Sequence, residues 1–241
     1  MTRTIAFMAT VASFFTLPAP AFAAPGAGDE VYGATIEPHP IELEARYGAL
    51  EGGADNGEDV LSLEASRTFG SRMQLALVGE FEKEPGEARK FDSIGLEAIY
   101  ALGETRGVAF GLYGEYERAI NGADKIETKL LVQHRRGPWD LRFNLIAEKE
   151  LDGREPVELA YAASADVGTV GELRLGVQAY GELGTFSRFL PRADHFLGPV
   201  AKIEIEGLGP EIELEGGYLF PFGAANEDTN GQLRLVVGIE F

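Results

Sequence analysis

Residues 232–241, QLRLVVGIEF, alternate between two kinds of side chain. One face carries Leu233, Leu235, Val237, Ile239 and Phe241, and the other carries Gln232, Arg234, Val236, Gly238 and Glu240. A strict period of two predicts a β-strand with one apolar and one more polar side. We expect this strand to close the structure.

The first 23 residues have the pattern of a signal peptide. Arg3 supplies a basic start, residues 5–17 (IAFMATVASFFTL) supply an apolar core, and residues 21–23 (AFA) form an A-x-A cleavage pattern. The alternative, a membrane anchor, is disfavoured because the apolar run is too short to span a bilayer. We therefore expect export, with Ala24 as the first residue of the mature chain.

Composition excludes several classes of protein. The formal charge is −18, and it becomes about −19 when the segment containing Arg3 is removed, so we expect no nucleic-acid partner. The chain has no cysteine, and hence no disulfide. Beyond the first 23 residues no run of 18 apolar residues occurs, which argues against helical membrane spans.

The alternation of the last strand recurs through the chain. We predict about twelve strands, with ten to fourteen compatible with the pattern, near residues 40–48, 59–69, 72–82, 91–102, 108–117, 125–135, 139–149, 157–166, 172–182, 196–206, 210–220 and 232–241. Most of these have the length of about 9–11 residues that a tilted strand needs to cross a bilayer. The connections alternate between long and short, as in membrane barrels with long external loops and short periplasmic turns.

The final strand, with Phe241 as its last residue, resembles the terminal strand of Gram-negative outer-membrane β-barrels. The resemblance implies recognition of this strand by the barrel assembly machinery and a location in the outer membrane, among its lipids and lipopolysaccharide. We therefore predict an all-β fold: a single up-and-down antiparallel transmembrane barrel over residues 40–241, preceded by a periplasmic lead segment, 24–39. This Gly-, Ala- and Pro-rich lead is interpreted as either a flexible segment or a short plug.

One face of the predicted strands is apolar and suits lipid, while the opposite face is charged. A soluble barrel turned inside out is the alternative, and the length of the strands disfavours it. The candidate lumen-lining residues are Glu42, Glu44, Arg46, Glu64, Glu80, Glu97, Glu115, Lys129, Arg142, Arg174, Lys202, Glu213, Glu215 and Arg234.

This acidic lumen predicts a passive channel or small-solute transporter that favours cations or neutral polar solutes. The alternative is a closed structural or surface-interaction barrel whose lumen is sealed by ion pairs. Strand number does not decide between them, since twelve strands lie between filled eight-stranded barrels and open porins.

Catalysis is the least expected function, although a membrane-embedded hydrolase is conceivable. The three histidines are His39, His134 and His195, and no serine lies two residues from any of them. No G-x-S-x-G motif and no metal-ligand spacing occur, so we predict no catalytic, metal or cofactor site. His134 is interpreted as an interfacial side chain.

The longest predicted connection, 183–195 (LGTFSRFLPRADH), is the most basic stretch of the chain. Three interpretations stay open: a loop that folds inward and constricts the pore, a contact with lipopolysaccharide phosphates, or a plain surface loop.

Overall fold

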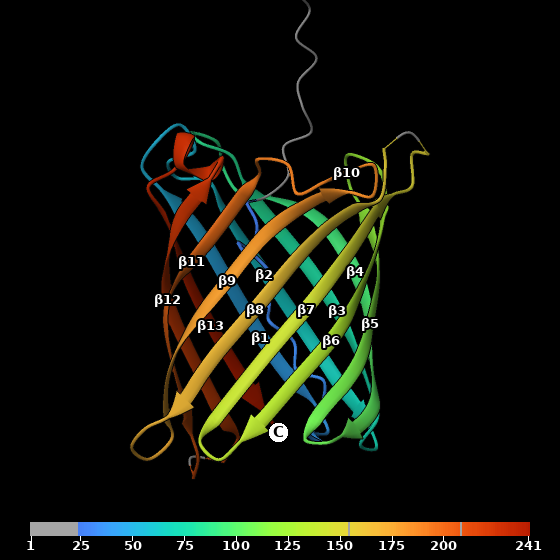
Figure 1. Cartoon of the computed structure of the whole chain (residues 1–241), viewed down its shortest axis with the longest axis vertical. Helices are drawn as coiled ribbons and strands as arrows, with labels where there is room; N and C mark the ends of the chain where they lie inside the picture. Colours follow the sequence, from blue (N-terminus) through green and yellow to red (C-terminus); the bar gives the residue numbers. More distant parts are fainter. Residues whose placement is uncertain (1–23, 154, 208) are drawn as a thin grey trace, which may run out of the picture.

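The computed structural model describes residues 24–153, 155–207 and 209–241, so the predicted signal peptide lies outside the described residues. Twelve long strands form a closed antiparallel barrel (Figure 1). They are β1 Glu42–Glu51, β2 Asp59–Phe69, β3 Met73–Lys83, β4 Lys90–Thr105, β5 Val108–Ala119, β6 Lys125–Arg136, β7 Trp139–Glu150, β8 Glu158–Gly168, β9 Leu173–Thr185, β11 Asp194–Ile205, β12 Glu211–Gly223 and β13 Gly231–Glu240. The predicted strands are confirmed, with ends that differ by a few residues.

Neighbouring strands in the chain pair with one another, and β13 pairs with β1 to close the barrel. Two short elements were not predicted: β10, Arg188–Phe189, which pairs with the end of β9, and a 3-10 turn, η1, Ala225–Glu227. In the described part of the chain, no helix is long and apolar enough to cross a membrane.

The connections at the two ends of the barrel differ in length. Residues 52–58, 84–89, 120–124, 151–157, 186–193 and 224–230 join strands at the loop end, and 70–72, 106–107, 137–138, 169–172 and 206–210 join them at the turn end. The predicted asymmetry holds, except that 120–124 and 206–210 are equally long.

Strand β4 shows how the alternation divides the two faces. Leu96 is 59% exposed on the outside, whereas its neighbour Glu97 is 4% exposed and points into the barrel. Exposed leucines, valines and isoleucines continue around the outside on the other strands. The outer surface is therefore apolar and the interior carries most of the charge, the arrangement that the sequence predicts for a membrane barrel.

The interior also holds residues 24–39, which run through the barrel from the loop end to the turn end (blue in Figure 1). We call residues 24–39 the plug, because they occupy the interior of the barrel. Its side chains alternate between opposite walls: Val31 packs in a cluster with Ile146 and Tyr180. Tyr32, Ala34 and Ile36 pack in a second cluster, with Ile99, Ala109, Tyr113 and Leu131. Inward-facing apolar residues thus form a core around the plug.

Candidate functional site: a plugged lumen with two chambers

Side chains on the barrel wall satisfy the backbone of the plug. Asn144 makes two bonds with Tyr32: the Tyr32 N–H donates to Asn144 Oδ1 (2.8 Å), and Asn144 Nδ2 donates to the Tyr32 carbonyl (2.9 Å). Gln133 Oε1 accepts from the Ala34 N–H (3.1 Å) and from the Thr35 hydroxyl (2.9 Å). These amides replace the neighbouring strand that an extended segment needs to satisfy its polar groups.

Three arginines on the barrel wall bind carbonyl groups of the plug. Arg46 Nε donates to Gly28 O (3.0 Å), Arg142 donates to Val31 O (3.2 Å), and Arg234 donates to Asp29 O. Because these cations are fixed on three different strands, they hold the plug from several sides.

Glycines allow the plug and the wall to approach closely. A Cβ added to Gly48 on β1 would lie 2.0 Å from the carbonyl oxygen of Ala27, and one added to Gly26 would lie 2.5 Å from the Tyr180 ring. No side chain larger than hydrogen fits at these contacts without displacement of the plug or the wall.

The plug begins at the loop end beside Glu58, where the Ala24 N–H donates to the Glu58 carboxylate. Burial raises the pKa of Glu58 to about 7, and the charge of Asp55 adds to the rise, while the Ala24 N–H acts in the opposite direction. This carboxyl lies outside the membrane-spanning strands, in the connection 52–58.

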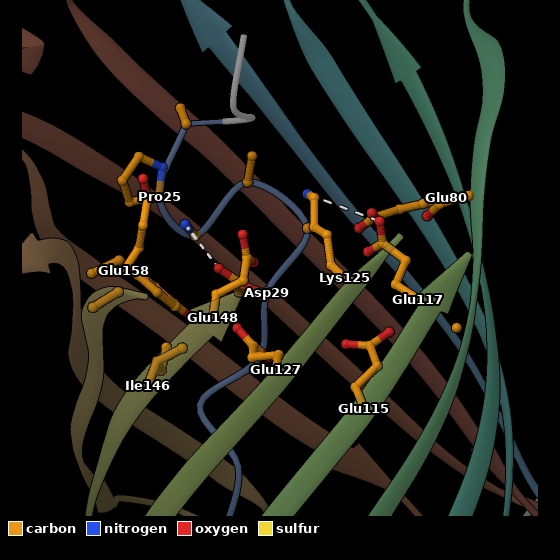
Figure 2. Close-up of a pocket in the computed structure, with 18 of the residues that line it drawn as sticks. Pro25, Asp29, Glu80, Glu115, Glu117, Lys125, Glu127, Ile146, Glu148 and Glu158 are labelled. Atoms are coloured by element: carbon orange, nitrogen blue, oxygen red, sulfur yellow. Dashed lines mark hydrogen bonds and ion pairs between the residues drawn. The ribbon is translucent and has the colours of Figure 1, made fainter. Parts of the chain in front are cut away.

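The plug leaves two cavities in the barrel. The loop-side chamber has a volume of about 590 Å³ and opens among the long connections (Figure 2). Its acidic lining comprises Asp29, Glu80, Glu82, Glu84, Asp92, Glu97, Glu115, Glu117, Glu127, Glu148, Glu150, Glu158 and Glu182. The basic side chains in its lining are Arg46, Lys125 and Lys129.

Two lysines lie within this acidic surface. Lys129 is 3% exposed, contacts Glu127 Oε1 (3.0 Å), and lies over the rings of Tyr32 (4.8 Å) and Tyr113 (4.5 Å). Lys125 contacts Glu117 Oε1 at 3.9 Å (Figure 2). Even with both lysines paired, the chamber keeps a large excess of carboxylates.

The turn-side chamber is smaller, about 280 Å³, and its charges are mixed. Arg142 contacts Asp140 (3.2 Å), Arg174 contacts Asp166, and Lys202 contacts Glu213. Arg135, on the same side, bridges Asp140 (3.3 Å) and Glu37 of the plug (2.7 Å). These ion pairs cross-link neighbouring strands and the plug.

Nearly all of the candidate lumen residues from the sequence line one of these chambers. Arg46, Glu80, Glu97, Glu115 and Lys129 line the loop-side chamber, and Glu44, Arg142, Arg174, Lys202, Glu213, Glu215 and Arg234 line the turn-side chamber. Glu42 and Glu64 line neither: Glu64 contacts Arg46 (2.8 Å), and Glu42 lies beside His39. Sequence reasoning did not identify the plug-binding amides Gln133 and Asn144, because an inward polar residue gives no sign of its partner.

The basic connection does not fold inward. Phe186, Phe189 and Leu190 are 76%, 58% and 63% exposed, so the interpretation of this loop as an internal constriction is wrong. Pairing of β10 with the end of β9 directs this hairpin along the rim, and Arg192 contacts Glu227 instead of a lumen carboxylate.

One serine and one histidine that are not near in the sequence meet in the barrel. Ser66 Oγ lies 3.5 Å from His39 Nε2, although the residues are far apart in the chain. The hydroxyl donates to Glu42 Oε2 (3.1 Å) and Ser66 is 3% exposed, so it is directed away from the imidazole and shielded from solvent. His134 lies at the turn end, within hydrogen-bond distance of the Gly107 carbonyl.

No protein-family model and no curated protein matches this chain. Solved structures do match. The KdgM porin has a TM-score of 0.56 at 11% identity, over 83% of this chain and 99% of that one. KdgM in complex with disordered oligogalacturonate gives 0.54 at 12% identity, over 83% and 98%. The outer membrane protein Omp33 of Acinetobacter baumannii gives 0.51 at 12% identity, over 84% and 98%. The chain therefore has the fold of the Gram-negative outer-membrane β-barrel proteins represented by KdgM and Omp33.

Proposed function

We propose that this protein is an outer-membrane channel of a Gram-negative bacterium, and that its lumen favours cations or neutral polar solutes. The observation that carries the proposal is the pair of chambers at opposite ends of one barrel, separated by the plug and the side chains packed around it. The fold that the chain shares with KdgM and Omp33 supports a channel, and the apolar outer face supports a membrane location.

The proposed selectivity rests on the loop-side chamber. A solute that enters there meets carboxylates on every side, whose field attracts cations and repels anions. One KdgM structure holds oligogalacturonate, a chain of negatively charged sugars. The acidic chamber opposes such a polyanion, so that ligand is not part of our proposal.

The plug is the constriction in this proposed pathway. Its backbone is bound by amides and guanidinium groups as well as packed by apolar side chains, and each such hydrogen bond contributes only about 0.5–1.5 kcal/mol net. We propose that passage requires a shift of part of residues 24–37.

The same plug favours a second candidate, a closed structural or surface-interaction barrel. The paired charges of the turn-side chamber and the bonds from arginines to the plug support this candidate. The two candidates differ in whether the intact protein conducts.

Planar-bilayer conductance of the refolded protein tests both candidates. We expect discrete channels with a reversal potential that favours K⁺ over Cl⁻. Deletion of residues 24–37 should raise the single-channel conductance several-fold, because it joins the two chambers. A wild-type protein that is silent while the deletion variant conducts would support the closed barrel, and anion selectivity would overturn the proposed role of the acids.

A double substitution distinguishes the effect of removing the plug from the effect of removing only the side chains that bind it. The double variant Gln133→Ala, Asn144→Ala keeps the plug but removes the amides that bind it. We expect frequent transitions between the wild-type conductance and that of the deletion. Gln178→Ala is the matched control, since Gln178 is a buried wall amide that donates to Glu215 rather than to the plug.

A further inference from the structure

Two carboxylates face each other where the barrel closes at the turn end. Glu42 on β1 and Glu240 on β13 are direct partners across the antiparallel pair. Like charges at such positions repel each other, so the pair requires a cation or a proton between them. Neither residue was expected to belong to a ligand site.

His39, at the end of the plug, brings an imidazole to this pair. Its Nε2 lies 3.3 Å from Glu42 Oε2, and its Nδ1 lies 3.9 Å from Glu240 Oε2. One nitrogen of His39 and one oxygen of each carboxylate lie within 4.8 Å of one another. About 3.3 Å separates the ligands of a tetrahedral Zn²⁺ ion at ordinary bond lengths. Shifts of up to about 1.5 Å bring the three groups to a common ion.

The imidazole also has an unused polar atom. The His39 side chain is 8% exposed, and its Nδ1 has no hydrogen-bond partner among the described residues. A buried imidazole nitrogen without a partner is costly unless it binds a proton, a water molecule or a metal ion. His39 Nδ1 faces Glu240 Oε2 at 3.9 Å, so a small shift of that carboxylate would bring both atoms to one ion.

Neighbouring groups fix the geometry of the cluster. The Thr68 hydroxyl accepts from the His39 N–H (3.0 Å) and donates to the His39 carbonyl (2.6 Å). Ser66 donates to Glu42 Oε2 (3.1 Å) and accepts from Gln74 Nε2 (3.0 Å). Bonds of this kind orient metal ligands in known sites. The side chain of Glu240 is 39% exposed, which leaves room for a water molecule as a fourth ligand.

We propose that His39, Glu42 and Glu240 bind a divalent transition-metal ion, with Zn²⁺ as the best match. An imidazole with two carboxylates suits zinc, whereas Ca²⁺ and Mg²⁺ prefer oxygen ligands alone. The ion joins the end of the plug to the first and last strands of the barrel. It therefore neutralises the pair at the closure and fastens the plug at its turn end. Sequence spacing could not predict this site, because its ligands meet only when the barrel closes.

Zinc binding to the folded full-length mature protein in detergent, without a polyhistidine tag, tests the proposal. After treatment with a chelator, isothermal titration with ZnCl₂ at pH 7.5 should show one ion bound per chain. His39→Ala should lower the affinity ~100-fold and Glu240→Gln at least ~10-fold, since even residues outside the ligand shell change metal affinity by these factors. His134→Ala and His195→Ala are matched controls that keep wild-type affinity.

A second measurement guards against variants that fail to fold. Zn²⁺ should raise the unfolding temperature of the wild type and of His134→Ala by several degrees, but not that of His39→Ala. Different gel migration of unboiled and boiled samples identifies folded barrels, and Glu240→Gln keeps the test available if His39→Ala does not fold. Absence of one-to-one binding by the wild type would overturn the proposal, as would unchanged affinity in folded His39→Ala or Glu240→Gln.

Discussion

The two chambers of this barrel are lined by the same kinds of residue in different proportions. In the turn-side chamber, Arg142, Arg174 and Lys202 each contact a carboxylate on their own or a neighbouring strand. In the loop-side chamber, carboxylates exceed lysines and arginines by a wide margin. Paired charges cancel at a distance and serve mainly to bind strands and plug together, whereas an excess of one sign creates a field that acts on solutes. We infer that the turn-side chamber mainly stabilises the barrel and its plug, and that the loop-side chamber determines which solutes enter.

Arg46 lies between these regions, so its loss should have the largest effect. It contacts Glu44 (2.8 Å) and Glu64 (2.8 Å), and it binds the Gly28 carbonyl of the plug. Arg46→Met leaves two buried carboxylates without their cation, which costs about 3–5 kcal/mol. Denaturant unfolding of the folded protein in micelles measures the change.

Arg188→Met is the control for this prediction. Arg188 is exposed on β10, so its removal should change the free energy of unfolding by about 0.5 kcal/mol or less. A loss below about 1 kcal/mol for Arg46→Met would mean that water or protons replace the guanidinium without difficulty, and the interior would then be wetter than its burial indicates.

The close contact between plug and wall gives the next largest effect. Gly48→Ala places a methyl group 2.0 Å from the Ala27 carbonyl oxygen, so the plug or β1 must move. We expect a loss of about 1–3 kcal/mol and faster hydrogen exchange in residues 24–30. Gly114→Ala is matched, because Gly114 is also in a strand and has nothing within 4 Å of the added Cβ. Equal losses of stability and equal hydrogen exchange in the two variants would contradict the close contact between Gly48 and the plug.

These glycines show where prediction from sequence ends. The twelve strands were predictable because each repeats a period of two over a length that few soluble strands reach. The inward position of Glu97 or Arg142 follows from the same period. The sequence does not state that Gly48 faces the backbone of Ala27, since a glycine in a strand has several explanations.

For a related reason, the sequence did not distinguish a plug from a flexible segment at residues 24–39. The apolar pattern of Val31, Tyr32, Ala34 and Ile36 covers too few residues to predict a strand. Three glycines also lie in this segment, so it has no clear alternation of polar and apolar side chains. Their partners, Gln133 and Asn144, are distant in the chain and ordinary in composition. Contacts that depend on barrel closure, such as that of His39 with Glu240, are likewise absent from local patterns.

Ion selectivity tests the difference between the two chambers by substitutions that should change stability little. The double variant Glu84→Gln, Glu150→Gln removes two charges from the loop-side chamber. Glu104→Gln, Glu206→Gln removes two charges from exposed positions at the turn end, outside both chambers. We expect the K⁺ over Cl⁻ permeability ratio to fall roughly twofold to fivefold in the first variant and to stay near wild type in the second. Equal shifts would show that net charge, and not the chamber, determines selectivity.

The smallest predicted effect concerns the start of the plug at Glu58. Its raised pKa of about 7, against 4.5 as the ordinary value, means that the folded protein binds this proton more tightly than the unfolded chain does. The resulting stability is present below pH 4.5 and is lost as the pH rises to about 7. Because the group is partly exposed, we expect about 1 kcal/mol. For a chain that continues before Ala24, the change in the free energy of unfolding between pH 5 and pH 8 should be smaller by about this amount in Glu58→Gln than in the parent.

Removal of the predicted signal peptide strengthens the interaction between residue 24 and the Glu58 carboxylate. A chain that starts at Ala24 carries an α-ammonium group, with an ordinary pKa of about 7.7–8.0, where the extended chain has only an amide N–H beside Glu58. The positive charge favours the ionised carboxylate, so the mature chain should lose less stability between pH 5 and pH 8 than the extended one. An equal pH dependence in both chains would mean that the amino group turns away from Glu58, and that the plug is held by Arg46 and the wall amides rather than at its first residue.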